Sequence, residues 1–288
     1  MRGLLRRLKL AILRTSGTLH ERRSDRRGQA PSDSRTEAGA SEWEYVSDGW
    51  AQPPMDGDVD AVARADRAKW GDYLAAIAAP NPLGVQHDPA GVTTGDVSAH
   101  NALVAFAYVV SLAARGRGRL SVLDWGGGIG HHWALARSVV PGLELEYHVK
   151  EAHAVCAQGR EVAPDVSFHE DEACLERGYD VVVASSSLQY AEDWSLLLDR
   201  LAGAAQSHLY VERVPVALSA PSFVVLRRAY AHGDGTGRLG WVLNRHEFLA
   251  YAAGSGVSLT REFLLDTRFS ADGAPETPVE HRSFLFNR

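Results

Sequence analysis

The fold of this chain is decided by the stretch VLDWGGGIG at residues 122–130. A short apolar run ends in an acid, Asp124, and glycines follow at positions 126, 128 and 130. Glycine adopts positive φ at no steric cost and lets a ligand approach the backbone closely. The pattern therefore predicts a β-strand, a tight loop and a helix that begins at His131, an arrangement at which open α/β sheets bind ligands.

Short apolar stretches alternate with helical ones from residue 119 onward. The predicted strands are 119–124, 143–149, 165–170, 179–187, 207–214, 257–265 and 281–288, and the predicted helices are 131–140, 151–162, 192–205 and 244–256. Alternation of this kind predicts right-handed crossovers in a mostly parallel, Rossmann-like α/β sheet of seven strands, with helices on both faces. The last two strands predict an antiparallel pair at the sheet edge.

The part of the chain before this alternation is predicted to fall into two segments. We expect residues 41–118 to form a helical extension. One of its helices is predicted to be capped by Asp58, and a second, over 96–116, is apolar almost all round. Residues 1–40 are polar and basic and predict a largely disordered tail. Within the tail, we expect residues 1–14 to make a weak contact with an anionic membrane surface or with a partner protein. The alternative is that they form a solvated, frayed start of the chain.

The charge and the cysteine content exclude several classes of function. The net charge of −6 is uneven, because residues 1–27 carry nine Lys and Arg against two acids, which leaves the remainder near −13. A body so acidic is a poor partner for nucleic acid, whose phosphates need clustered basic side chains. Two cysteines are too few for a disulfide framework, and no apolar run approaches the length of a membrane span. We therefore expect a cytoplasmic enzyme.

Two acids at strand ends indicate which ligand the glycine loop takes. A dinucleotide site presents backbone N–H groups to a pyrophosphate, which a carboxylate at Asp124 would repel. The spacing also departs from the dinucleotide pattern, because Gly130 follows Gly128 by two residues and not by three. S-adenosylmethionine has no phosphate, and its ammonium and sulfonium suit a carboxylate. Glu151 ends the second strand, where it can accept hydrogen bonds from both ribose hydroxyls of an adenosyl group. The alternatives are a glycine-rich structural turn and an ordinary surface glutamate.

The chain at this point resembles the class I S-adenosylmethionine-dependent methyltransferases. The resemblance covers about residues 95–288 and rests on the Asp-x-Gly-x-Gly-x-Gly pattern, the acid that closes the next strand and the seven-strand plan. Within that superfamily, the chain is similar to a family of methyltransferases often encoded beside bacterial surface-polysaccharide genes. The stretches that carry this narrower similarity are the region of Trp50, LDWGGGIG at 123–130, SSSLQY at 185–190, YVERVP at 210–215 and WVLN at 241–244. The chain departs from that family at Val214, where threonine is usual, and in its richer glycine loop.

The resemblance implies different roles for the two ordered parts of the chain. Residues 119–288 are expected to bind the cofactor through Asp124, the three glycines and Glu151, while 41–118 form a lid or an acceptor pocket. Asp171 is expected near the adenine edge, Ser185 and Ser186 at the reactive end of the cofactor, and Tyr190 at the rim of the active site. The alternatives are a solvated acid, serines of an ordinary strand-end turn and a packed aromatic ring.

Transfer of a methyl group to a hydroxyl benefits from a general base, for which the sequence offers several side chains. We expect catalytic roles for His131, Tyr190 and Glu212, with His132 and His100 as further candidates. The start of a helix lowers the pKa of an imidazole, which favours the neutral form that a base needs. Alternatively, Glu212 forms a buried ion pair with the arginine that follows it. The histidines lack the spacing of a metal site, so no metal is expected.

The sequence thus predicts methyl transfer from S-adenosylmethionine to a small-molecule or glycan acceptor, at oxygen. Three alternatives remain open at this stage. They are a non-catalytic partner protein that retains the fold, an enzyme that uses the same cofactor for chemistry other than methylation, and an NAD-dependent oxidoreductase.

Overall fold

The computed structural model describes residues 43–50, 59–88, 91–228 and 237–288. Residues 41–288 form one compact unit. The predicted tail over 1–40, with its membrane or partner contact, lies outside the described residues, as does Asp58.

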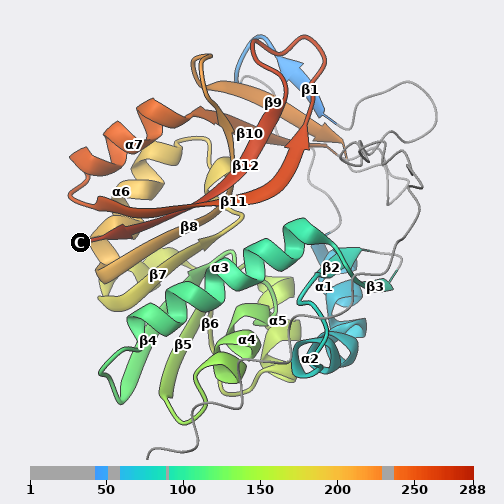
Figure 1. The fold of residues 1–288 in the computed structure, drawn as a ribbon, viewed down its shortest axis with the longest axis vertical. Coiled ribbons are helices and arrows are strands. Elements are labelled where there is room, and N and C mark those ends of the chain that lie inside the picture. Colours follow the sequence, from blue (N-terminus) through green and yellow to red (C-terminus); the bar gives the residue numbers. More distant parts are fainter. Residues whose placement is uncertain (1–42, 51–58, 89–90, 229–236) are drawn as a thin grey trace, which may run out of the picture. The chain divides into compact units, whose positions relative to one another are not determined.

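Five parallel strands form the centre of the sheet (Figure 1). They are β4 (Arg119–Trp125), β5 (Glu144–Lys150), β6 (Ser167–His169), β7 (Tyr179–Ser185) and β8 (Ala205–Ala217), in the order β8-β7-β4-β5-β6. The crossovers carry the helices α4 (His131–Val139), α5 (His153–Val162) and α6 (Trp194–Ala204) and the short 3₁₀ helices η1 (Glu172–Glu176) and η2 (Leu188–Tyr190). Valine-rich runs such as VVVA in β7 are buried on both faces, as parallel strands require.

Helices cover both faces of this sheet, each over its own apolar core (Figure 1). The core under α4 and α5 includes Ile129, Leu135 and Val149, and the core under α6 includes Leu198 and Leu201. The arrangement confirms the predicted Rossmann-like fold.

The C-terminal strands form the predicted antiparallel pair. Strand β12 (Val279–Asn287) runs antiparallel to both β8 and β11 (Ser258–Phe269), so it lies between them in the sheet. Together with the five parallel strands, this pair makes up the predicted seven. Helix α7 (Arg245–Gly254) precedes β11, and the side chain of Asn244 caps its first turn by accepting a hydrogen bond from the backbone N–H of Glu247 at 3.0 Å.

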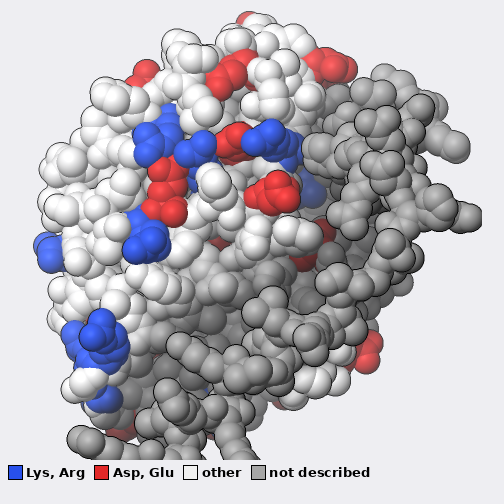
Figure 2. Space-filling model, viewed as in Figure 1, with Lys and Arg blue, Asp and Glu red and all other residues white. Residues whose placement is uncertain are grey.

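Charged side chains gather over β11 and β12 on the face shown in Figure 2. A chain of ion pairs links α7 to these strands: Arg245 to Glu262, Glu262 to Arg282, Arg282 to Glu280 and Glu280 to Arg268, with N–O distances of 2.5 to 3.0 Å. The charges alternate in sign, so the face carries little net charge.

Three further strands, which the sequence analysis did not predict, extend from the C-terminal end of β8. Strand β10 (Gly237–Asn244) pairs with β8 in parallel through two residue pairs, β9 (Phe223–Arg228) pairs antiparallel with β10, and β1 (Trp43–Val46) pairs antiparallel with β9. The extension before residue 118 was expected to be helical and instead also supplies a strand. Stacking of Trp43 on Phe269, with ring centroids 4.2 Å apart, joins β1 to β11, and no local pattern reveals such a distant partner.

The rest of the N-terminal part is helical, with one hairpin. Its elements are α1 (Val59–Ala68), α2 (Trp70–Ala78), the hairpin of β2 (Val85–Asp88) and β3 (Gly91–Thr94), and α3 (Val97–Ala113). The side chain of Asp96 caps α3 by accepting a hydrogen bond from Ala99 N–H at 2.6 Å. Helix α3 was expected to be buried all round, but Val104 and Tyr108 are exposed, because only one side of the helix packs on the sheet. No helix in the described ranges is long and apolar enough to cross a bilayer.

Candidate functional site

The glycine loop follows β4 at the carboxyl edge of the parallel sheet. Gly126, Gly128 and Gly130 have φ of 77°, 60° and 105°, a left-handed region that side chains rarely adopt. A Cβ atom at Gly126 would lie 2.6 Å from the Cβ of Ser187, whereas one at Gly128 would meet only the Nδ1 of His131, at 3.5 Å. The loop therefore leaves open space beside Gly128, where a ligand can reach the backbone.

Asp124 lies beneath this loop and is fully buried. Its carboxylate accepts hydrogen bonds from Tyr147 Oη at 3.0 Å and from Ser185 Oγ, and the Nδ1 of His132 lies 3.3 Å from it. A Cβ atom at Gly127 would lie only 2.5 Å from its Cγ, so a bare glycine is required above it. Because the carboxylate oxygens are engaged by side chains of the chain itself, Asp124 supports the loop from within.

Glu151 connects the end of β5 to the same loop. Its Oε1 accepts a hydrogen bond from the backbone N–H of Gly128 at 3.2 Å, and its Oε2 accepts one from that of Ala152 at 2.9 Å. The side chain also lines a pocket, so the predicted acid stands where a carboxylate meets the open part of the loop.

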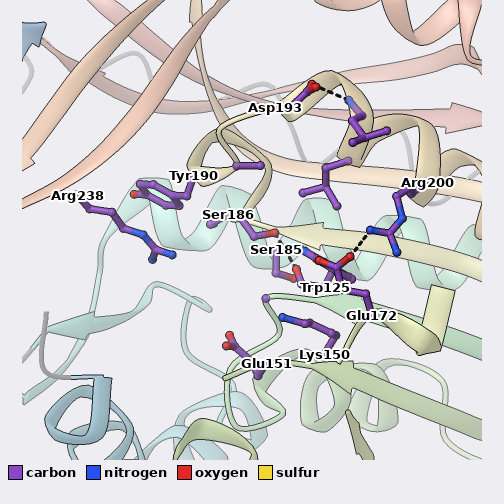
Figure 3. A pocket seen from close by; sticks show the side chains of 15 residues that line it. Trp125, Lys150, Glu151, Glu172, Ser185, Ser186, Tyr190, Asp193, Arg200 and Arg238 are labelled. Atoms are coloured by element: carbon purple, nitrogen blue, oxygen red, sulfur yellow. Dashed lines mark hydrogen bonds and ion pairs between the residues drawn. The ribbon is translucent and has the colours of Figure 1, made fainter. Parts of the chain in front are cut away.

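The pocket has a volume of about 510 Å³, within the usual range for small-molecule sites. Figure 3 shows the side chains that line it, which come from the ends of β4, β5 and β7, from η1, η2 and α6, and from β10. Five of the predicted site residues line it: Gly126, Glu151, Ser185, Ser186 and Tyr190. The structure thus brings residues distant in the sequence together at one edge of the sheet.

Ser186 has an unusual backbone conformation for a residue with a side chain. Its φ is 51°, in the left-handed region that costs such residues energy. Its carbonyl accepts a hydrogen bond from the buried side chain of Gln189 at 3.0 Å, which holds the turn after β7. Strain of this kind is concentrated at functional sites.

Two other residues predicted to bind the cofactor have structural contacts in the protein. Gly130 precedes α4 and packs closely, since a Cβ atom there would lie 3.3 Å from the Cβ of Ala163. Asp171 is exposed and caps η1 by accepting a hydrogen bond from Ala173 N–H at 3.1 Å.

The three predicted catalytic side chains occupy different surroundings. Tyr190 lines the pocket. The ring of His131 lies near those of Trp70 and Tyr73, at centroid distances of 5.4 and 4.8 Å, and its carbonyl accepts a hydrogen bond from Tyr73 Oη at 3.0 Å. Glu212 is buried near the end of β8. His100, a further candidate, accepts a hydrogen bond at its Nδ1 from the backbone N–H of Leu83 at 3.1 Å.

The adjacent His132 forms the centre of a buried charge cluster. Its Nδ1 lies 3.3 Å from the Oδ2 of Asp124, its Nε2 lies 3.4 Å from the Oε2 of Glu212, and its ring stacks on Phe106 with centroids 4.1 Å apart. Burial acts to lower the pKa of His132, but the negative charges of Glu212 and then Asp124 outweigh it and raise the pKa to about 9. The expectation of a lowered pKa at the helix start was wrong for His132, because the two carboxylates raise the pKa of this imidazole. Burial in turn raises the pKa of Glu212.

The sequence analysis missed several charged residues of the pocket. Lys150, Glu172, Arg200 and Arg238 line it, and no motif singles them out. Lys150 alone had a detectable signal, since it directly precedes Glu151 at the end of β5.

Within the described part of the chain, no group of three or more His, Cys, Asp or Glu side chains is placed to hold a metal ion.

No protein-family model and no curated protein matches this chain. Solved structures to which this chain is similar include the magnesium protoporphyrin IX methyltransferase of Synechocystis PCC 6803 with bound SAH, at 16% identity and a TM-score of 0.47, covering 79% of this chain and 98% of that one. They also include an amino pentose methyltransferase of Micromonospora echinaspora with bound SAM, at 14% identity and a TM-score of 0.42, covering 65% of this chain and 89% of that one. A third is the 1,6-didemethyltoxoflavin-N1-methyltransferase of Burkholderia thailandensis, at 14% identity and a TM-score of 0.45, covering 82% of this chain and 92% of that one. Because the identities are low and the TM-scores lie below 0.5, these structures assign no role to the residues of this chain.

Proposed function

We propose that this protein is an enzyme that transfers a methyl group from S-adenosylmethionine to an oxygen atom of a small-molecule or glycan acceptor. The observation that carries the proposal is the contact between Glu151 and the glycine loop at the mouth of the pocket. The Oε1 of Glu151 lies there 3.2 Å from the backbone nitrogen of Gly128, in a left-handed stretch of backbone that is open to a ligand. The same contact distinguishes two classes of nucleoside cofactor.

The contact favours a nucleoside cofactor without phosphates. A dinucleotide would use the N–H groups of the loop to bind its pyrophosphate. In this protein the N–H of Gly128 is already donated to Glu151, and the carboxylate would repel a phosphate group. A carboxylate at this point suits ribose hydroxyls, which are hydrogen-bond donors. These residues therefore fit an adenosyl group. Since NAD carries a ribose as well, it is the Gly128 N–H already donated to Glu151 that disfavours NAD.

When bound, S-adenosylmethionine supplies an electrophilic methyl group on a positively charged sulfur. The task of the protein is then mainly to align the acceptor oxygen, and alignment alone is worth effective molarities on the order of 10⁵ to 10⁸ M. Ser185, Ser186 and Tyr190 line the pocket and offer hydroxyl groups that can orient a hydroxyl acceptor.

The residues of the buried cluster have a supporting role in this scheme. With a pKa of about 9, His132 is protonated at neutral pH and does not act as a base. It places a positive charge between Asp124 under the loop and Glu212 on β8, and so stabilises two acids that burial would otherwise penalise.

Calorimetric titration with S-adenosylhomocysteine tests the proposal directly. The wild-type protein should bind it, and Gly128→Ala should weaken binding at least tenfold, because the added methyl group enters the open space beside the loop. Gly116→Ala is the matched control, since Gly116 also has positive φ (73°) and nothing within 4 Å of an added Cβ. Equal affinity of all three proteins for S-adenosylhomocysteine would show that the glycine loop is not part of the binding site.

The same preparations separate the alternative functions. Binding of NADH and not of S-adenosylhomocysteine would establish an oxidoreductase, and binding of neither would indicate a non-catalytic protein. Consumption of S-adenosylmethionine without release of S-adenosylhomocysteine would indicate other chemistry with the same cofactor.

A further inference from the structure

The acidic side chains that line the pocket are already engaged by the protein. Glu151 accepts two backbone hydrogen bonds, and Glu172 forms an ion pair with Arg200. Asp193 caps α6 by accepting a hydrogen bond from Leu196 N–H at 2.9 Å. The charge of Glu172 is therefore neutralised by Arg200, while the carboxylates of Glu151 and Asp193 are held in place by backbone N–H groups.

Two basic side chains of the pocket are engaged differently. The guanidinium of Arg238 lies over the ring of Tyr190, 4.3 Å from its centroid, and the Nζ of Lys150 lies 4.9 Å from the ring centroid of Trp125. Among the residues that the structure describes, neither has a carboxylate within 4.0 Å. An aromatic ring holds a cation in place without neutralising its charge.

Arg238 is held at one end of the pocket by contacts between β10 and η2. Figure 3 shows it beside Tyr190, at the opposite end from Arg200. Two contacts fix β10 against this turn: the indole of Trp241 donates a hydrogen bond to the carbonyl of Glu192 at 3.1 Å, and Gly240 packs so closely that an added Cβ would lie 3.4 Å from the Tyr190 ring. The contact with the Tyr190 ring uses no N–H of the guanidinium as a hydrogen-bond donor to an oxygen, so these N–H groups can bind a planar or tetrahedral anion.

We propose that the methyl acceptor carries an anionic group, a carboxylate or a phosphate, and that Arg238 binds it at the Tyr190 end of the pocket. The proposal rests on the proposed function, which assigns the part of the pocket beside Glu151 and the glycine loop to the cofactor. Lys150 adjoins Glu151 and so belongs to that part. Arg238 and Tyr190 remain for the acceptor.

Anion binding to the protein saturated with S-adenosylhomocysteine tests this assignment. The probes are inorganic phosphate and, separately, acetate, followed by NMR of the arginine side-chain N–H resonances. We expect saturable binding of at least one probe, weakened roughly tenfold or more in Arg238→Gln, as loss of a charge-assisted hydrogen bond implies. The probe that binds more tightly distinguishes a phosphate from a carboxylate acceptor.

Arg261→Gln is the matched control, because Arg261 is also an exposed arginine over a tyrosine ring, that of Tyr108, and lies outside the pocket. It should bind the probe as the wild type does. Absence of saturable binding, or equal weakening in Arg238→Gln and Arg261→Gln, would overturn the proposal.

Affinity for S-adenosylhomocysteine separates this proposal from the proposed function. Arg238→Gln should bind the nucleoside within twofold of the wild type; a tenfold loss would show that Arg238 holds the carboxylate of the cofactor and would refute the acceptor role. If the wild type binds no S-adenosylhomocysteine, the proposed function fails. The anion titration of the ligand-free protein then still reports whether Arg238 binds anions, and a failure there refutes the inference as well.

Discussion

His132 should make the protein lose stability as the pH rises from about 6.5 to about 9. Its imidazole lies between Glu212 and Asp124, with Arg213 as the opposing charge, and its pKa is raised from 6.5 to about 9. The folded state therefore binds this proton more tightly than the unfolded chain does. The stabilisation is fully present below pH 6.5 and is lost as the pH passes through 9.

The size of the effect follows from the same pKa. Each tenfold difference in proton affinity is worth about 1.4 kcal/mol, so a change from 6.5 to about 9 corresponds to roughly 3 kcal/mol. That is a large part of the 5–15 kcal/mol typical of a folded domain. Other histidines with shifted pKa values, namely His148, His169 and His281, are all lowered. Their contributions change below pH 6.5. Burial raises the pKa values of Cys156 and Cys174 from 9.0, so the contributions of these thiols change only above pH 9, and the window to test for His132 is pH 6.5 to 9.

Two measurements check this prediction. NMR titration of the imidazole carbon resonances should give His132 a midpoint near 9, and Glu212→Gln should lower it, because Glu212 is the strongest of the groups that raise this pKa. Urea unfolding of the wild type should show a loss of about 3 kcal/mol between pH 6.5 and 9. His246→Gln, a change at an exposed histidine of α7, should keep the same slope. A wild-type midpoint at or below 6.5 would refute the reasoning.

Two further predictions concern pH at the acid end. Burial acts to raise the pKa of Glu276, but hydrogen bonds from the backbone N–H groups of residues 218–220 lower it to about 2. Its contribution is therefore present above pH 4.5 and lost toward pH 2. Glu276→Gln should cost roughly 1–3 kcal/mol in urea unfolding at pH 7 and little at pH 2.5, and an equal cost at both would contradict this account. Burial, aided by Arg213 and Arg227, lowers the pKa of His281 to about 3, so its neutral form favours folding above pH 6.5 and this advantage is lost as the pH falls toward 3. His281→Phe should pack beside the stacked rings of Trp43 and Phe269 and should raise the melting temperature at pH 4 relative to the wild type, whereas unchanged acid sensitivity would exclude this role.

The parts of the fold that the sequence predicted correctly are those that local patterns determine. The glycines at 126, 128 and 130 need positive φ, and the run VVVA in β7 is typical of a strand buried on both faces. Strands β9 and β10 were missed although they are apolar. They are defined by partners far away in the chain, as when Trp43 of β1 pairs with Arg227 of β9.

The site divides in the same way. Glu151 and Ser185 were predicted to lie in it because they end parallel strands, and the carboxyl ends of such strands share one edge. Of the two adjacent histidines, the one that faces the carboxylates could not be chosen from sequence, because consecutive residues on a helix point about 100° apart and the packing of α4 decides the rotation. Arg238 could not be found either, since contacts of β10 with η2, which is distant in the sequence, bring it to the pocket.

The hydrogen bond from Tyr73 to the carbonyl of His131 ties α2 to the first turn of α4, directly after the glycine loop. A ligand bound to that loop would therefore stabilise the turn to which α2 is hydrogen-bonded. By linkage, a ligand at one hundred times its dissociation constant adds about 2.7 kcal/mol against any opening that releases it. We expect release of that ligand to loosen α2 as well, because this hydrogen bond joins α2 to the turn.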